Sequence, residues 1–247
     1  MYFLMGFSMR TWISGCLLML LSLVGPLVGT SASAAEPVEG TDFIVLTPAR
    51  PTSAPNKIVI TEFFSYQCPH CFHFSFLLGP WVEKLPSDVV FERIPVSFGR
   101  PDWGSIAQAY YSLQAMGKLD AKLDTAIFDA IHEKHIRLSD MSSISDWLVR
   151  QGISGTEFND TYNSFGIRSS MTRAEQATPA YGIDGVPTII VDGKYRVPSK
   201  TDMSEVLAIA DQLIAKVRAA RGMPTPQAKA VPTAVSPTVT AKPKAKK

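Results

Sequence analysis

The sequence predicts an α/β fold in which a block of helices interrupts the strands. Three observations predict it. Residues 58–64 have the apolar, β-branched pattern of a buried strand, residues 186–197 have that of a β-hairpin, and residues 103–181 between them show hardly any strand pattern. We therefore expect residues 36–102 and 182–221 to build the α/β part and residues 103–181 to form an all-helical insertion.

The first strand and its surroundings have a clear pattern. Residues 58–64 read Ile-Val-Ile-Thr-Glu-Phe-Phe, which suits a strand buried on both faces, so the acid Glu62 within it is conspicuous. Residues 72–85 are typical of a helix, and we expect Gly79-Pro80 to interrupt or kink it. Residues 89–96 predict a second strand.

Apolar residues in the insertion recur at helical spacing, for example at Ile106, Tyr110 and Leu113. Three glycines, at positions 117, 152 and 166, fall where helices are expected to end. The sequence therefore predicts several short helices in this block.

The C-terminal part of the α/β region contains a hairpin and a helix. Asp192-Gly193 separates two short apolar runs, which is a strong hairpin signal. Residues 204–221 predict an amphipathic helix with Val206, Ile209, Leu213 and Val217 on one stripe. Residues 222–247 contain Pro, Ala, Thr and Lys without periodicity, so we expect a disordered tail.

The N-terminus has the layout of a secretory signal. Arg10 precedes an apolar run at residues 12–28, and small residues occupy positions 31–35. We expect residues 1–35 to be a cleaved signal peptide and the mature protein to lie in the periplasm. An uncleaved anchor and a lipidation site at Cys16 are the alternatives.

Charge is distributed unevenly along the 247 residues. The formal net charge is +2, but the residues after Arg221 include five lysines and no acids, and the first 35 residues include only Arg10. The segment between them has 18 basic and 22 acidic residues, a net charge of −4. A nucleic-acid-binding surface is usually basic, so we expect no nucleic-acid partner.

Loss of the leader would leave two cysteines, Cys68 and Cys71, in the run Cys-Pro-His-Cys. A bridge across so short a loop removes little entropy from the unfolded chain, so the pair points to chemistry or to metal binding. Zinc could use both cysteines with His73, but structural zinc sites usually combine two separated pairs. Covalent haem attachment needs a histidine directly after the second cysteine, where Phe72 stands. We expect no metal and no cofactor.

The order of residues in this run favours a reactive thiolate at Cys68. Pro69 suits the first position of a helix, which makes Cys68 the N-cap. Backbone N–H groups of His70 and Cys71 and the helix dipole would then stabilise the anion and lower its pKa from about 8.5 to between ~3.5 and ~7.5. His70 either stabilises the thiolate further or is merely solvated. Cys71 suits the resolving role, and a stabilised Cys68 thiolate makes the disulfide a good oxidant.

The segment from Glu62 to Cys71 resembles the active-site segment of the DsbA family of periplasmic disulfide oxidases, within the thioredoxin superfamily. The resemblance covers about residues 43–221 and implies a thioredoxin-like fold with the inserted all-helical domain. It implies that Pro187 is a cis proline facing the disulfide and that the Val186 backbone pairs with an extended substrate. A trans proline that opens a strand is the alternative.

The resemblance also implies that Glu62 is an acid buried behind the disulfide, where it accepts or relays the proton of Cys71. Alternatively, Glu62 is a structural acid paired with Arg93, and both can hold at once. Members of the family often have an acid near the position of Ser75, and its absence here leaves further details of a proton relay open.

In function, the resemblance implies an oxidase. The Cys68–Cys71 disulfide would accept electrons from reduced exported polypeptides, and an inner-membrane, quinone-linked partner of the DsbB type would restore it. A reductase or isomerase is the first alternative. Such isomerases usually have a separate dimerisation domain, which the sequence does not indicate, so we expect a monomer. A non-catalytic binding or chaperone module is the second alternative.

Overall fold

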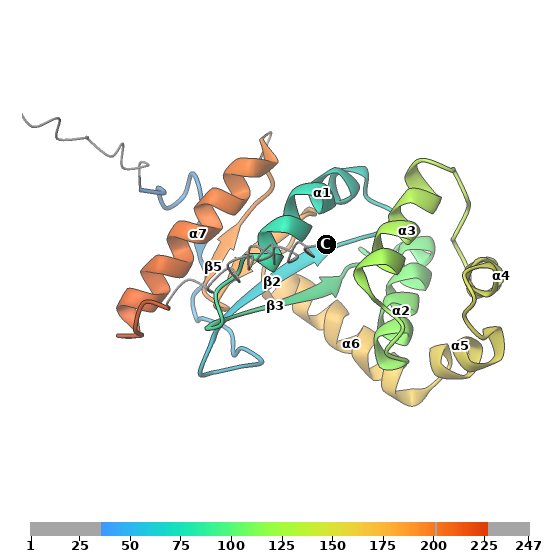
Figure 1. The fold of residues 1–247 in the computed structure, drawn as a ribbon. Coiled ribbons are helices and arrows are strands. Elements are labelled where there is room, and N and C mark those ends of the chain that lie inside the picture. The colour runs from blue at the N-terminus through green and yellow to red at the C-terminus, as the bar shows by residue number, and fades with distance from the viewer. Residues whose placement is uncertain (1–35, 201, 227–247) are drawn as a thin grey trace, which may run out of the picture. The chain divides into compact units, whose positions relative to one another are not determined.

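The strands form one mixed β-sheet with the order β1-β5-β4-β2-β3 (Figure 1). The computed structural model describes residues 36–200 and 202–226. The predicted signal peptide, residues 1–35, and most of the predicted tail, residues 227–247, lie outside the described residues.

Strand β2 (Ile58–Phe64) is an inner strand of the sheet. It pairs in parallel with β3 (Val89–Pro95) and antiparallel with β4 (Thr188–Val191). All seven residues of β2 are buried, because helices cover both faces of the sheet at this strand. The strands predicted at residues 58–64 and 89–96 are confirmed.

Strands β4 and β5 (Tyr195–Val197) form the predicted hairpin. The turn residues Asp192 and Gly193 both have positive φ angles, 57° and 63°, as in a type I′ turn. Strand β1 (Ile44–Val45) adds an edge by pairing antiparallel with β5. The sequence did not predict β1, because two residues are too few to show an alternating pattern.

Gly193 lies against the chain segment that precedes β2. A Cβ atom here would stand 2.2 Å from the carbonyl oxygen of Arg50, and the φ angle is unfavourable for other residues. We expect Gly193→Ala to lower the free energy of unfolding by about 2 to 4 kcal/mol in chemical denaturation. Gly117, with a φ of 63° and open space around it, is the matched control, and Gly117→Ala should cost only about 1 kcal/mol. Equal losses would contradict the proposed clash.

Helices α1 (Pro69–Glu83) and α7 (Met203–Ala220) pack together on one face of the sheet. Phe74 of α1 and Leu213 of α7 share a buried apolar cluster with Ile60 of β2. The predicted stripe of α7 is confirmed, since all four of its residues are buried. This packing fixes the helix that begins at the cysteines.

The first helix is not interrupted at Gly79-Pro80, and the alternative expectation, a kink there, stays a prediction. Helix α1 runs without a break through Gly79 and Pro80. Both residues are exposed, and no atom lies within 4 Å of the position where a Cβ of Gly79 would be. The backbone can therefore adjust to the proline ring without displacing core side chains.

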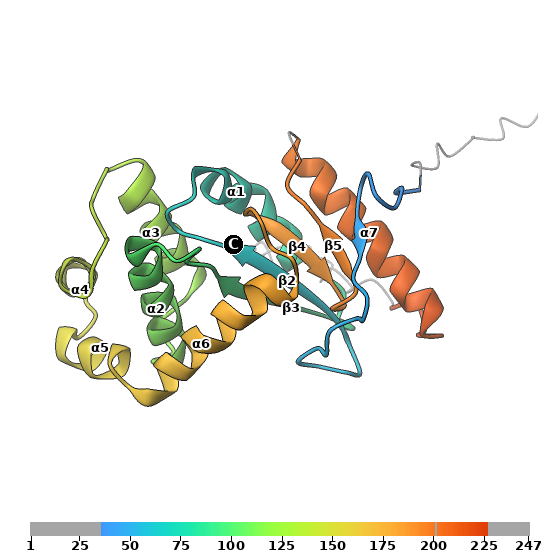
Figure 2. The ribbon, with the colours of Figure 1, turned by 180° about the vertical axis from the view of Figure 1, so that it is seen from behind.

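The predicted insertion is helical throughout. It consists of α2 (Pro101–Ala115), α3 (Ala121–His132), α4 (Met141–Arg150), α5 (Gly155–Tyr162) and α6 (Phe165–Ala180). Figure 2 shows α2 to α5 gathered beyond one end of the sheet and α6 returning towards it. Helix α2 begins at Pro101, slightly before the predicted boundary at residue 103.

Side-chain caps begin four of these helices, where Asp120, Asp140, Ser154 and Ser164 accept hydrogen bonds from backbone N–H groups. Gly117 and Gly152 follow helix ends with positive φ angles, as predicted. Gly166 instead lies in the first turn of α6, because the Ser164 cap starts a new helix there. No helix within residues 36–200 and 202–226 combines the length and apolar character needed to cross a bilayer.

Candidate active site

Cys68 and Val186 lie side by side at one end of the two inner strands β2 and β4. Since β2 and β4 are antiparallel, the end of the first strand lies beside the start of the second, with Phe63 opposite Thr188. The Cys68 thiol donates a hydrogen bond of 3.4 Å to the carbonyl oxygen of Val186. The peptide bond between Val186 and Pro187 is cis, as the resemblance implied. Residues 118 positions apart thus form one site.

Cys68 is the N-cap of α1 and Pro69 its first residue, as predicted. No backbone N–H group of the first turn makes a capping hydrogen bond of full geometry to the sulfur. The N–H groups of Cys71 and His70 nevertheless lie close enough to act on it, as predicted. The pKa of Cys68 is lowered to about 6. A hydrogen bond from the Cys71 thiol is the largest cause, burial opposes it, and the backbone dipoles of Cys71 and His70 add to it.

The pKa of Cys71 is shifted in the opposite direction from that of Cys68. Cys71 lies one turn into α1 and is fully buried, and burial raises its pKa well above the usual range. The hydrogen bond to Cys68 and the negative charge of Glu62 raise it further. Both cysteines are free thiols here. At neutral pH the pair therefore holds one thiolate, at Cys68, and one thiol, at Cys71.

His70 is exposed at the start of α1, and its charge contributes to the low pKa of Cys68. We expect His70→Leu to raise that pKa by roughly 0.5 unit, since a nearby positive charge favours the thiolate. The pKa of Cys68 is measured as the midpoint of thiolate absorbance against pH in the reduced protein. His73, also exposed and three residues further along α1, gives the matched control His73→Leu, which should change it less. A larger change in the control would exclude a specific role for His70.

Glu62 forms the predicted ion pair with Arg93. Its side chain is 1% exposed, and its Oε2 atom accepts a 2.6 Å hydrogen bond from Arg93 Nε. Its Oε1 atom has no hydrogen-bond partner among the described residues. Burial raises the pKa of Glu62 to about 7, although Arg93 opposes the rise. Glu62 can therefore change its charge near neutral pH.

Sequence reasoning missed the residues beyond this pair. Asp124 of α3 accepts a 2.8 Å hydrogen bond from Arg93 Nη1 and a short one from the Tyr66 hydroxyl group. His132 of the same helix lies 2.8 Å from the carbonyl oxygen of Tyr66 and stacks on Phe72. Nothing in the local pattern of α3 could have indicated these contacts, because they depend on how the insertion packs.

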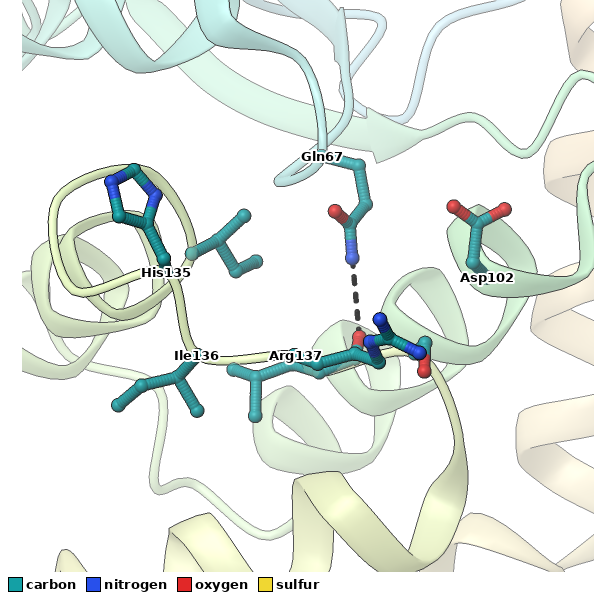
Figure 3. Close-up of a pocket in the computed structure, with 8 residues that line it drawn as sticks. Gln67, Asp102, His135, Ile136 and Arg137 are labelled. Atoms are coloured by element: carbon teal, nitrogen blue, oxygen red, sulfur yellow. Dashed lines mark hydrogen bonds between the residues drawn. The ribbon is translucent and has the colours of Figure 1, made fainter.

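A polar pocket of about 430 Å³ adjoins the residue before Cys68 (Figure 3). In Figure 3 the Gln67 side chain points to the loop between α3 and α4, where its amide nitrogen donates to the carbonyl oxygen of Leu138 at 3.2 Å. His135 and Asp102 line opposite sides of this pocket. The insertion thus contributes directly to the surface around the reactive cysteine.

The described residues contain no group of three His, Cys, Asp or Glu side chains placed to hold a metal ion. Cys68, Cys71 and His73 are accordingly not grouped as three metal ligands in this structure. The opposed pKa values of the two cysteines instead suit dithiol exchange.

Comparison with known proteins agrees with this geometry. The model of the DSBA-like thioredoxin domain matches residues 59–210. The thiol:disulfide interchange protein DsbA of Pseudomonas syringae pv. tomato is 43% identical over 197 residues, which cover 78% of this chain and 91% of that protein. DsbA of Burkholderia cepacia is 39% identical over 67% of this chain and 77% of its own length.

Solved structures agree as well. The crystal structure of Pseudomonas aeruginosa DsbA is 40% identical, with a TM-score of 0.70 over 73% of this chain and 94% of that one. Reduced DsbA1 from Neisseria meningitidis is 28% identical, with a TM-score of 0.68 over 76% of this chain and 99% of that one. The predicted thioredoxin-like fold with a helical insertion is thereby confirmed, and the chain belongs to the DSBA-like thioredoxin domain family.

Proposed function

We propose that this protein is a thiol-disulfide oxidoreductase that donates its Cys68–Cys71 disulfide to reduced exported polypeptides. The observation that supports it best is the unequal pair of cysteines beside Val186 and cis Pro187. One sulfur favours the thiolate with a pKa of about 6, and the other favours the thiol. Because oxidation removes the stabilised thiolate, this pair favours the reduced state and so acts as an oxidant.

The reaction consists of two thiol-disulfide exchanges. A substrate thiolate attacks the Cys68 sulfur, the Cys68–Cys71 bond breaks, and Cys71 leaves and takes up a proton. A second substrate thiolate then attacks the substrate sulfur of the mixed disulfide and releases Cys68 as a thiolate. The substrate loses two electrons and the protein gains them. The low pKa of Cys68 makes it the better leaving group in the second step.

Glu62 is the proposed proton partner of Cys71. Its pKa of about 7 allows it to give a proton when Cys71 leaves and to accept one when Cys71 is deprotonated for reoxidation. Its negative charge is among the causes of the raised pKa of Cys71. The two groups are therefore electrostatically coupled.

Substrate binding is assigned to the loop around Val186 and Pro187. The Val186 carbonyl oxygen lies 3.4 Å from the Cys68 sulfur and accepts from it when Cys68 is a thiol. Main-chain pairing of an extended substrate with Val186 would place the substrate cysteine beside Cys68 and would leave side chains unspecified. We expect broad specificity for unfolded polypeptides.

The setting of the protein is also a proposal. We assign residues 1–35 to a signal peptide, residues 36–102 and 182–221 to the thioredoxin-like domain, residues 103–181 to the insertion and residues 222–247 to a tail. The mature protein would work as a monomer in the periplasm, and a quinone-linked membrane protein of the DsbB type would reoxidise it.

Equilibration of the purified protein with reduced and oxidised glutathione tests the direction of electron flow. We expect a reduction potential towards the oxidising end of the thioredoxin-like range, which reaches about −120 mV in DsbA. The oxidised protein should also form disulfides in a reduced, unfolded protein substrate. A potential near about −270 mV would instead identify a reductase.

A further inference from the structure

The guanidinium group of Arg93 forms ion pairs with two carboxylates behind the active site, those of Glu62 and Asp124. Arg93 donates from Nε to Glu62 at 2.6 Å and from Nη1 to Asp124 at 2.8 Å. The guanidinium also lies 3.6 Å above the ring of Phe64. The Arg93 side chain is 11% exposed and that of Asp124 is 23% exposed, so water screens the interaction between these charges only in part.

Asp124 is fixed from a second direction. Its Oδ1 atom accepts from both Arg93 and the hydroxyl group of Tyr66, which is buried two residues before Cys68. Hydrogen bonds to a charged oxygen are stronger than those between neutral groups, so these two donors hold the carboxylate in place. The insertion thus supplies, through α3, a fixed negative charge to the far side of Arg93.

The charge balance of this cluster depends on Asp124. With Arg93 positive and Asp124 negative, the cluster is neutral when Glu62 is protonated and carries one negative charge when Glu62 is ionised. Without the charge of Asp124, the cluster would be neutral only when Glu62 is ionised. A buried cluster favours the neutral arrangement, so Asp124 decides which protonation state of Glu62 is favoured.

No other group around Glu62 among the described residues provides the fixed negative charge that Asp124 provides. From α1 it faces Cys68 and Cys71, and the charge of Cys68 disfavours ionisation only while that thiolate is present. Tyr110 of α2 lies near the same cluster as a neutral phenol with a pKa of about 12. Glu92 of β3 accepts instead from Thr61. On β4 the residue opposite Glu62 is the apolar Ile189.

We infer that Asp124 is a positioning residue of the reaction, which shares Arg93 with Glu62 and thereby keeps Glu62 able to exchange a proton with Cys71. This inference rests on the proposed function for its role in catalysis. During reoxidation the Cys71 thiol gives its proton to the Glu62 carboxylate, and the Cys71 thiolate attacks the Cys68 sulfur of the mixed disulfide. The intramolecular disulfide forms and the partner leaves as a thiolate.

The direct test is the titration of the Glu62 carboxyl group by carbon NMR in the reduced protein. Asp124 raises the pKa of Glu62, which is about 7 in the parent protein. We expect Asp124→Asn to lower this midpoint by about one unit or more, since Arg93 then pairs with Glu62 alone. Asp124→Ala removes the same charge without a new amide group and should act alike. Asp124→Glu keeps the charge and should restore the midpoint towards the parent value.

Asp129→Asn is the matched control. Asp129 lies on the same helix, and its side chain makes no ion pair or hydrogen bond with the residues that the structure describes. Its replacement should leave the Glu62 midpoint unchanged. An unchanged midpoint in both charge-removing variants, or an equal shift in the control, would overturn the inference.

A kinetic measurement connects the titration to the reaction. The pH profile of disulfide closure from a mixed disulfide of Cys68 with glutathione reports the availability of the Glu62 carboxylate. Its acidic limb should move to lower pH in Asp124→Asn in parallel with the NMR midpoint. If the midpoint moves and the limb does not, the positioning role is overturned. The NMR titration needs no substrate, so failure of the oxidase proposal would leave its outcome intact.

Discussion

Replacing Cys68 with serine is expected to abolish thiol-disulfide exchange. The remaining thiol, Cys71, is fully buried and has a raised pKa, so almost none of it is a thiolate at neutral pH. A serine hydroxyl group does not attack disulfides under these conditions. The rate of exchange with oxidised glutathione, measured by stopped-flow mixing, should fall by at least about three orders of magnitude.

Cys71→Ser is the matched variant for this experiment, because it retains the reactive thiolate and removes only the second thiol. It should react at its first step and then accumulate mixed disulfides with glutathione and with reduced polypeptides, which mass spectrometry can identify. Substantial exchange in Cys68→Ser, or no trapped species in Cys71→Ser, would exclude the proposed roles of the two cysteines.

Glu62→Gln is expected to remove a large pH dependence of stability. The pKa of Glu62 rises from 4.5 to about 7 on folding, so the folded protein keeps a proton that the unfolded chain releases. Stability therefore falls as pH rises through this interval. The loss is complete above the folded pKa and amounts to about 3 kcal/mol. Glutamine resembles the protonated acid, and the variant should lack this loss.

Urea denaturation of both reduced proteins at pH 4.5 and pH 8 measures the effect. The variant should gain about 3 kcal/mol relative to the parent protein between these two pH values. Arg93 keeps Asp124 as a partner, so its charge is not left without compensation. Parallel pH profiles in the two proteins would contradict a raised pKa of Glu62.

The parts of the fold that the sequence predicted have local causes. The β-branched run of β2 and the Asp192-Gly193 turn each determine their structure within a few residues. Pro69 likewise determines the start of α1 and the place of Cys68. Strand β1 was missed because it has only two residues and because its pairing partner β5 lies about 150 residues later in the chain.

The candidate site was likewise predictable only where its residues are set by local sequence. The cysteines, Glu62 and its pairing with Arg93 follow from a short motif and from neighbouring strands. Asp124 was not predictable, because an acid near the start of a helix usually serves the helix itself. The uninterrupted course of α1 through Pro80 also depends on context, namely the open surroundings of an exposed turn.

The contact between Arg93 and Asp124 has a consequence for engineering. The two residues belong to different parts of the fold, since Arg93 lies on the sheet and Asp124 on the insertion. Insertions exchanged between relatives to build chimeras would therefore exchange one of the three charged residues of this cluster. A chimera that retains Arg93 needs an insertion with a carboxylate at the position of Asp124. Without that carboxylate, the exchanged insertion would alter the charge state of Glu62, although it includes neither Glu62 nor the cysteines.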